Sequence, residues 1–232
     1  MGRPASNRRA VVRTASGTVR LPAVPGVHTE QRFWADGATV AGIDEVGRGA
    51  WAGQLTVGAV VLPSGRRMYK LRDSKVLDPA RREELAGKLE GFALGIGLGE
   101  ATHAEIDALG LSAALTLAAR RAVAALPFHP DVVLVDGDRD LLGDGRAHTE
   151  LLTHGDARSA SIAAASIVAK VARDRDMVAA DERFRGYGFA SNKGYPSPAH
   201  RAALAQLGPC ELHRRSWAPV AAAETPTLPF GP

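Results

Sequence analysis

Residues 40–49 read Val-Ala-Gly-Ile-Asp-Glu-Val-Gly-Arg-Gly, and this stretch decides the fold. Its apolar first half is typical of a buried β-strand, which runs directly into two adjacent carboxylates, Asp44 and Glu45. Side chains alternate in direction along a strand, so both carboxylates can face one site only if the chain bends there. Buried carboxylates are also costly unless a metal ion or a cationic side chain compensates for their charge. The stretch therefore indicates a strand that ends at a charged site.

The glycines that follow allow a second interpretation. Gly47-x-Gly49-x-x-Ala52 fits the loose form of the dinucleotide-binding fingerprint, which needs a strand before it and a helix after it. Residues 54–63 are instead β-branched, contain glycine and end in proline, which predicts a second strand. No helix N-terminus then follows that could hold a pyrophosphate. The pattern excludes a dinucleotide site and leaves a turn with one cation in its middle.

The composition limits the class of protein. A chain of 232 residues with 45% hydrophobic residues can bury one core with a small appendage, and its net charge of +4 is compatible with a nucleic-acid partner. The single cysteine, Cys210, excludes an intrachain disulfide and is typical of a reducing compartment. The sequence shows no run of roughly 18 apolar residues and no signal-peptide pattern. We expect a cytoplasmic protein without a membrane segment.

Periodicity along the rest of the chain predicts alternating strands and helices, and hence an α/β fold. Residues 92–99 alternate in the manner of a third strand, and residues 132–137 form a continuous apolar strand that ends in Asp136. Residues 158–162 have the pattern of a short strand or strand end. The loop 138–152 carries mixed charges and receives no assignment. Helices are expected from residue 78 to about 91, from 102 to about 126, over 163–183 and over 199–207.

Shifts in composition predict four parts. Residues 1–36 are rich in arginine and poor in periodicity, and we expect a flexible basic arm with a short ordered piece near Phe33-Trp34. Residues 37–186 are expected to form the main domain. Residues 187–221 are expected to form a small subdomain whose basic end, with its neighbouring tryptophan, suits a nucleic-acid backbone. Residues 222–232 read as a disordered tail.

Four carboxylates stand out: Asp44 and Glu45 at the end of the first strand, Asp136 at the end of the fourth, and Asp174 on the last large helix. Sites in open α/β sheets lie at the carboxyl ends of strands. Asp174 shares one helix face with Ser166 and Lys170, although an ordinary Lys170–Asp174 ion pair is the alternative. A cluster of carboxylates without cysteine or convergent histidine suits Mg²⁺ or Mn²⁺ rather than zinc. Such a site calls for a phosphate-bearing substrate.

With these features the sequence resembles ribonuclease HII, the type 2 ribonuclease H of bacteria, over roughly residues 38–220. The resemblance is carried by residues 42–49 (Gly-Ile-Asp-Glu-Val-Gly-Arg-Gly), 73–75 (Asp-Ser-Lys), 135–137 (Val-Asp-Gly), 162–174, 194–196 (Gly-Tyr-Pro) and 213–216 (His-Arg-Arg-Ser). It implies a ribonuclease H-like, five-stranded mixed sheet flanked by helices, with a small helical C-terminal subdomain. It also implies that the metal-binding catalytic carboxylates, which together hold two divalent ions, are Asp44, Glu45, Asp136 and Asp174.

The resemblance implies the substrate contacts as well. Gly47-Arg48-Gly49 is expected to read the ribose 2′-hydroxyl, and Tyr195 to stack on the neighbouring sugar. Lys75 and Lys170 are expected to hold phosphates or to balance the carboxylates; the sequence does not decide which. Further contacts with the substrate are expected from Ser166, Arg214 and Arg215.

The implied function is that of a metal-dependent endoribonuclease. It would cleave the RNA strand of RNA–DNA hybrids, and would cut duplex DNA on the 5′ side of a single embedded ribonucleotide, leaving 3′-hydroxyl and 5′-phosphate ends. We expect a monomer that acts on these nucleic acids and not at a membrane. Two alternatives share the scaffold. A non-catalytic nucleic-acid-binding protein would be expected to lack one of the four carboxylates, and none is missing. A DNA nuclease has no 2′-hydroxyl to recognise, so the expected sugar-reading residues argue against it.

Overall fold

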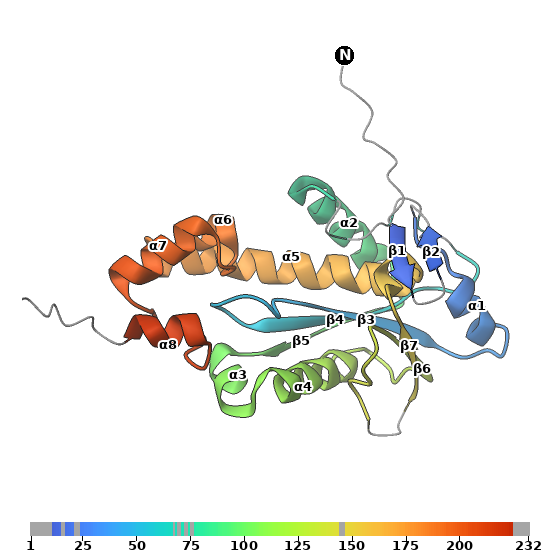
Figure 1. Ribbon diagram of the computed structural model, residues 1–232. Coiled ribbons are helices and arrows are strands. Elements are labelled where there is room, and N and C mark those ends of the chain that lie inside the picture. The colour runs from blue at the N-terminus through green and yellow to red at the C-terminus, as the bar shows by residue number, and fades with distance from the viewer. Residues whose placement is uncertain are drawn as a thin grey trace, which may run out of the picture.

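A central five-stranded sheet with helices on both faces forms the body of the protein (Figure 1). The computed structural model describes residues 11–14, 17–20, 24–66, 68, 71, 74, 77–143 and 147–224. The strands of the sheet are β3 (Val40–Val46), β4 (Leu55–Val61), β5 (Gly95–Ala101), β6 (Val132–Asp136) and β7 (His148–Leu152). They lie in the order β5-β4-β3-β6-β7. The first two pairings in that order are antiparallel and the last two are parallel, so the predicted mixed sheet is confirmed.

Two helical layers cover this sheet (Figure 1). One face carries α2 (Pro79–Phe92) and the long α5 (Ala160–Arg183), and the other carries α3 (His103–Leu109) and α4 (Leu111–Ala124). A 3₁₀ turn, η2 (Gly155–Ala157), precedes α5. The remaining elements are the hairpin of β1 (Val11–Thr14) and β2 (Gly17–Arg20), α1 (His28–Trp34), α6 (Phe189–Asn192), α7 (Pro198–Leu207) and α8 (Ala218–Glu224). Among the described helices, none combines the length and the apolar character that a membrane crossing requires.

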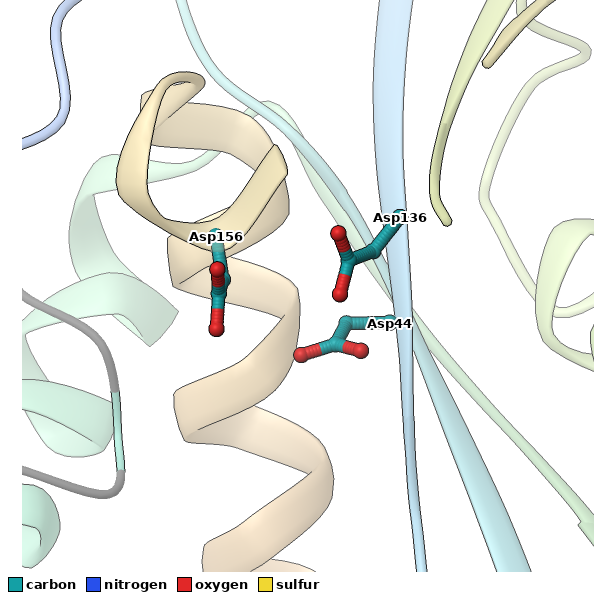
Figure 2. Close-up of side chains that lie close together, drawn as sticks. All are labelled: Asp44, Asp136 and Asp156. Carbon is teal, nitrogen blue, oxygen red and sulfur yellow. The ribbon is translucent and has the colours of Figure 1, made fainter. Parts of the chain in front are cut away.

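The parallel pairing of β3 with β6 fixes where the site lies. Ile43 is in register with Val135, so the next residues along each strand, Asp44 and Asp136, emerge side by side at one end of the sheet (Figure 2). The sheet thereby brings together two carboxylates that are 92 positions apart in the sequence.

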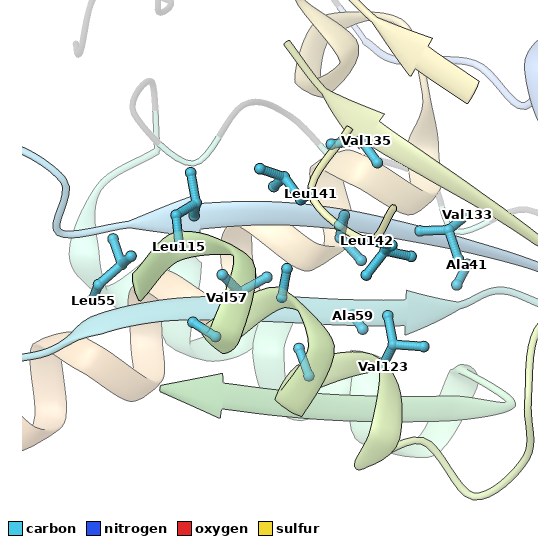
Figure 3. Packing of buried hydrophobic residues seen from close by; sticks show 14 of the residues in the cluster. Ala41, Leu55, Val57, Ala59, Leu115, Val123, Val133, Val135, Leu141 and Leu142 are labelled. Carbon is cyan, nitrogen blue, oxygen red and sulfur yellow. The ribbon is translucent and has the colours of Figure 1, made fainter. Parts of the chain in front are cut away.

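Helix α5 lies unusually close to the sheet because two strand residues have no side chain. A Cβ atom at Gly42 of β3 would lie 2.3 Å from the carbonyl carbon of Ser161, and one at Gly58 of β4 would lie 2.5 Å from the carbonyl oxygen of Ala165. Helix backbone and strand backbone are therefore in direct contact. On the opposite face, Ile43, Val57 and other residues of the strands pack against α4 in a continuous apolar core (Figure 3).

The predicted starts of α2 and α3 are confirmed, and the long helix predicted from residue 102 is in fact two helices. Asp78 caps α2 by accepting a hydrogen bond from the Arg81 amide (2.8 Å), and Thr102 and Glu105 form the expected capping box. The single helix expected from 102 to about 126 is wrong, because Gly110 has a φ of 76° and separates α3 from α4. A residue with this positive φ cannot continue an α-helix, and glycine adopts such a conformation without steric cost.

The strand predicted at 158–162 is also wrong. Ser159 makes only an isolated bridge to Gly26, and its side chain accepts a hydrogen bond from the Ile162 amide, so it caps α5 instead. The fifth strand is β7, inside the loop that received no assignment. It is an edge strand with one fully buried residue, Leu152, and therefore lacks the apolar periodicity that reveals central strands.

Part of the predicted N-terminal arm packs on the body of the protein. Glu30 of α1 is fully buried, and its Oε1 accepts hydrogen bonds from the Ser159 hydroxyl (2.6 Å) and the Ser161 amide (2.9 Å) at the start of α5. The short ordered piece expected near Phe33-Trp34 is confirmed as part of α1, and residues 24–36 do not belong to a flexible arm. Residues 1–10, 15–16 and 21–23 lie outside the described residues, as do residues 225–232 of the predicted tail; residues 222–224 belong to α8.

Candidate active site

Three aspartates converge at the ends of β3 and β6. Asp44, Asp136 and Asp156 each offer a carboxylate oxygen, and these atoms lie within 4.8 Å of one another (Figure 2). Asp156 comes from η2, the turn that leads into α5. The structure thus brings together two of the four predicted ligands with a third aspartate that the sequence analysis missed.

Hydrogen bonds from the neighbouring backbone fix two of these carboxylates. Asp136 Oδ1 accepts from the Gly155 amide (2.7 Å), which ties the end of β6 to η2. Asp44 Oδ1 accepts from the Glu45 amide (2.8 Å), and the carboxylate of Asp44 also accepts from the Ser166 hydroxyl. Ser166 in turn lies 2.8 Å from the hydroxyl of Ser74. Ser166 thus contacts Asp44, and its role as a substrate contact stays a prediction.

The electrostatics of the cluster suit a divalent cation. Burial raises the pKa of Asp44 well above its ordinary value, and the negative charges of Asp136 and Glu45 raise it further. Three carboxylates that repel one another in a buried position need compensating positive charge. Their donor atoms are all oxygens, which Mg²⁺ and Mn²⁺ prefer and zinc does not. The residues present therefore fit the predicted kind of metal ion.

Glu45 lies on the other side of the strand. β3 stays paired with β4 through Val46, so the expected bend at the two carboxylates is wrong and the normal alternation holds. Glu45 accepts a hydrogen bond from Arg48 (3.0 Å) and lines a pocket of about 190 Å³ at the start of α4. Asp136 lines the same pocket. Glu45 is consequently close to the aspartate cluster without belonging to it, and Asp136 lies between the two.

Asp174 lies outside the aspartate cluster. It accepts a short hydrogen bond from Lys170 (2.5 Å), and Arg82 lies 4.0 Å from its other oxygen. Both Lys170 and Asp174 line a groove of about 630 Å³ between α2, α5 and α6. The contacts are those of the ion pair that the sequence left open as the alternative. Asp156, directly before the capped start of α5, occupies the place expected for Asp174.

The predicted sugar-reading residues do lie together. Gly47 has a φ of 95° and is buried, whereas Arg48 and Gly49 are exposed. The Gly47 amide donates a hydrogen bond to the hydroxyl of Tyr195 (3.1 Å). Tyr195 thus joins the turn that follows Asp44 and Glu45, although the two segments are 148 positions apart.

Three of the basic residues predicted to contact the substrate, Arg214, Arg215 and Lys75, have different environments. Arg214 is fully buried, and its guanidinium donates to the backbone carbonyls of Gly53 (3.0 Å) and Arg48 (3.2 Å). It therefore holds the turn from behind and presents no charge at the surface. Arg215 is exposed and forms an ion pair with Glu224. Lys75 lies outside the described residues.

A mixed sheet with a buried carboxylate cluster at the ends of neighbouring parallel strands defines a class, the metal-dependent nucleases with the ribonuclease H fold. Comparison with known proteins identifies the family within that class. The sequence profile of ribonuclease HII matches residues 41–220. The chain belongs to the ribonuclease HII family, and it is accordingly a ribonuclease H, a metal-dependent endonuclease that acts on nucleic acid.

Individual relatives agree over most of the chain. The ribonuclease HII of Moorella thermoacetica is 53% identical over 189 residues, which cover 81% of this chain and 91% of that protein. The Thermus thermophilus ribonuclease HII is 48% identical over 199 residues, covering 84% and 93%. Among solved structures, ribonuclease H2 from Pyrococcus horikoshii superposes with a TM-score of 0.68 at 29% identity, covering 80% of this chain and 97% of that one. The predicted fold and enzyme class are confirmed.

Proposed function

We propose that the protein cleaves the RNA strand of RNA–DNA hybrids and cuts duplex DNA on the 5′ side of a single embedded ribonucleotide. The products would carry 3′-hydroxyl and 5′-phosphate ends. The observation that supports this most directly is the hydrogen bond between the Gly47 amide and the Tyr195 hydroxyl. The bond joins the turn that follows Asp44 and Glu45 to an aromatic ring, and such a pair would distinguish two adjacent sugars of one strand.

The metal would be Mg²⁺ or Mn²⁺, and we propose two ions. Asp44, Asp136 and Asp156 would hold one, and Glu45 and Asp136, which line one pocket, would hold the other. When bound, such ions supply a water-derived nucleophile and stabilise the charge on the leaving oxygen. The protein contributes the fixed position of the carboxylates, through the Gly155 and Glu45 amides and the Ser166 hydroxyl. In this proposal Asp174 keeps its pairing with Lys170 and binds no metal.

Recognition would start at the exposed turn. Gly49 has no side chain and open space around it, so the backbone there can approach a sugar closely. A 2′-hydroxyl both donates and accepts, which matches backbone N–H and C=O groups presented together. Arg48 extends into solvent beside Glu45 and can contact the adjacent phosphate. The ring of Tyr195 would stack on the next sugar, where a deoxyribose fits better than a ribose.

Cleavage of defined duplexes tests the proposal. Labelled duplexes with zero, one or several ribonucleotides would be incubated in Mg²⁺ and in Mn²⁺, with a 2′-O-methyl duplex as a control. We expect cleavage 5′ to the single ribonucleotide and no cleavage of the all-DNA or 2′-O-methyl duplexes. A site built on a hydrogen bond to a hydroxyl rejects substrates without it by about 10⁴-fold or more. Comparable cleavage of all-DNA would instead indicate a DNA nuclease.

We further propose that residues 37–186 act as the catalytic domain and residues 187–221 as the substrate-binding subdomain, in a cytoplasmic monomer. Support comes from a second, small apolar core around Tyr187 and Phe189, which Ala52 and Met177 of the main body complete. Backbone hydrogen bonds from the Trp51 amide to Gly194 (2.8 Å) and from the Gly53 amide to Leu212 (2.9 Å) join this part to the turn. Light scattering after gel filtration tests the monomeric state, and a dimer mass would contradict it.

A further inference from the structure

The buried arginine Arg173 connects the two halves of the proposed sugar-reading site. It lies on α5, is fully buried, and directs its guanidinium at three backbone carbonyls. Nε donates to Gln54 (2.8 Å) and Nη2 to Ala52 (3.1 Å), both in the segment that follows the exposed turn. Nη1 donates to Lys193 (2.9 Å), two residues before Tyr195. One side chain thus joins both segments.

The same guanidinium also touches the residues that would face the substrate. Its central carbon lies 5.4 Å from the centre of the Tyr195 ring. A Cβ atom at Gly47 would lie 2.5 Å from Nε of Arg173, so glycine is required there for the turn to pack on the arginine. Arg173 therefore lies behind both groups that meet in the hydrogen bond between Gly47 and Tyr195.

No shorter or simpler side chain can reproduce this arrangement. Arginine presents donors in a rigid planar fork, whereas a lysine ammonium is a single point with donors in other directions. Burial of a cation is costly, and here the acceptors are neutral carbonyl oxygens. Burial accordingly lowers the pKa of Arg173 below its ordinary value. The carbonyl groups that stabilise the buried guanidinium belong to the segments that determine the position of the turn relative to Tyr195.

We propose that Arg173 is a positioning residue for ribonucleotide recognition. It fixes the separation between the Gly47 turn and the Tyr195 ring, and so determines how well the enzyme distinguishes a ribonucleotide from a deoxyribonucleotide. It does not touch the metal ligands, so metal binding does not depend on it. This inference rests on the proposed function, in which those two groups read adjacent sugars.

The test compares two variants of Arg173 with a matched control. Arg173→Lys keeps the charge and loses the fork, and Arg173→Gln buries no charge and is the safer variant for folding. The control is Arg175→Lys, since Arg175 lies two residues further on the same helix, is exposed and pairs with Glu83. Circular dichroism first establishes that each variant is folded. The readouts are KM and kcat on a single-ribonucleotide duplex, the Kd for an all-DNA duplex divided by the Kd for the single-ribonucleotide duplex (the Kd ratio), and the Mn²⁺-induced shift in Tm.

We expect both Arg173 variants to raise KM and to reduce the Kd ratio by about tenfold or more, while the Mn²⁺-induced shift stays at the parent value. Arg175→Lys should match the parent in all readouts. A folded Arg173→Gln variant with KM and Kd ratio within twofold of the parent would overturn the positioning role. If the parent itself binds the two duplexes equally, the proposed function fails and the positioning role fails with it.

A double-mutant cycle with Tyr195→Phe separates positioning from general stability. This substitution keeps the ring and removes the oxygen that accepts from Gly47. If Arg173 acts by placing Tyr195, the second substitution should add little to the loss of discrimination caused by the first. If the effects of the two substitutions on the Kd ratio multiply, Arg173 acts independently of Tyr195, and the inference is overturned.

Discussion

Replacement of Glu30 by alanine should destabilise the protein by about 3 kcal/mol, although Glu30 does not belong to the aspartate cluster. Its Oε1 accepts from the Ser159 hydroxyl and the Ser161 amide, and the side chain is fully buried. Alanine would leave both donors buried without this acceptor. Each orphaned buried donor costs about 1–3 kcal/mol, and the space left by the lost side chain adds to the cost.

The assay is thermal unfolding followed by circular dichroism, with urea unfolding for the free energy. For a chain of this size about 3 kcal/mol corresponds to a fall in Tm of about 6–12 °C. Gln31→Ala on the same helix is the matched control, since Gln31 is exposed, and its Tm should change by no more than about 2 °C. Glu30→Gln keeps an acceptor oxygen and should cost less than Glu30→Ala. A Glu30→Ala protein that melts with the control would refute the view that α1 supports the start of α5.

Three other perturbations follow from the site. Cleavage should slow by roughly 10²-fold or more, with the fold retained, in Asp44→Asn, Asp136→Asn or Asp156→Asn. The rate of Asp174→Asn should stay within a few-fold of the parent rate. Equal losses for all four variants would restore Asp174 as a ligand. Because burial and the Asp136 charge raise the pKa of Asp44, the folded protein holds that proton more tightly than the unfolded chain. The metal-free protein should therefore lose stability as the pH rises through that raised pKa and level off above it, and Asp44→Asn should flatten the slope seen in urea unfolding across a pH series. Arg48→Ala should reduce the slope of log Kd against log salt by about 0.9 if Arg48 contacts one phosphate, and an unchanged slope would exclude that contact.

The part of the site that lies on central strands was predictable. Asp44 and Asp136 follow apolar runs typical of buried strands, and the carboxyl ends of parallel neighbours meet at one edge. Asp156 was not predictable in the same way, because a 3₁₀ turn has no periodicity and its place depends on how β7 leads the chain back to α5. The usable signal was its position, in a turn directly before the N-cap Ser159.

Asp174 shows the limit of reasoning from a shared helix face. It lies on the same face as Ser166, which does contact Asp44. An α-helix rises 1.5 Å per residue, so the eight residues between them carry Asp174 about 12 Å along the axis. Arg214 shows a related limit, since a basic run in the sequence reveals charge but not burial. Its guanidinium binds carbonyls inside the protein, and only tertiary structure reveals this.

Contact between the α5 backbone and the strands at Gly42 and Gly58 makes the frame around the carboxylates stiff. No side chain lies between helix and sheet at these points, so no change of rotamer can let the helix slide away from Asp44. Mg²⁺ binds oxygen at about 2.0–2.1 Å in a strict octahedron, whereas Ca²⁺ needs about 2.3–2.6 Å and more ligands. We expect a frame that does not widen to favour the smaller ion at the proposed metal site. The two glycines would then bear on ion selectivity, although neither offers a ligand atom.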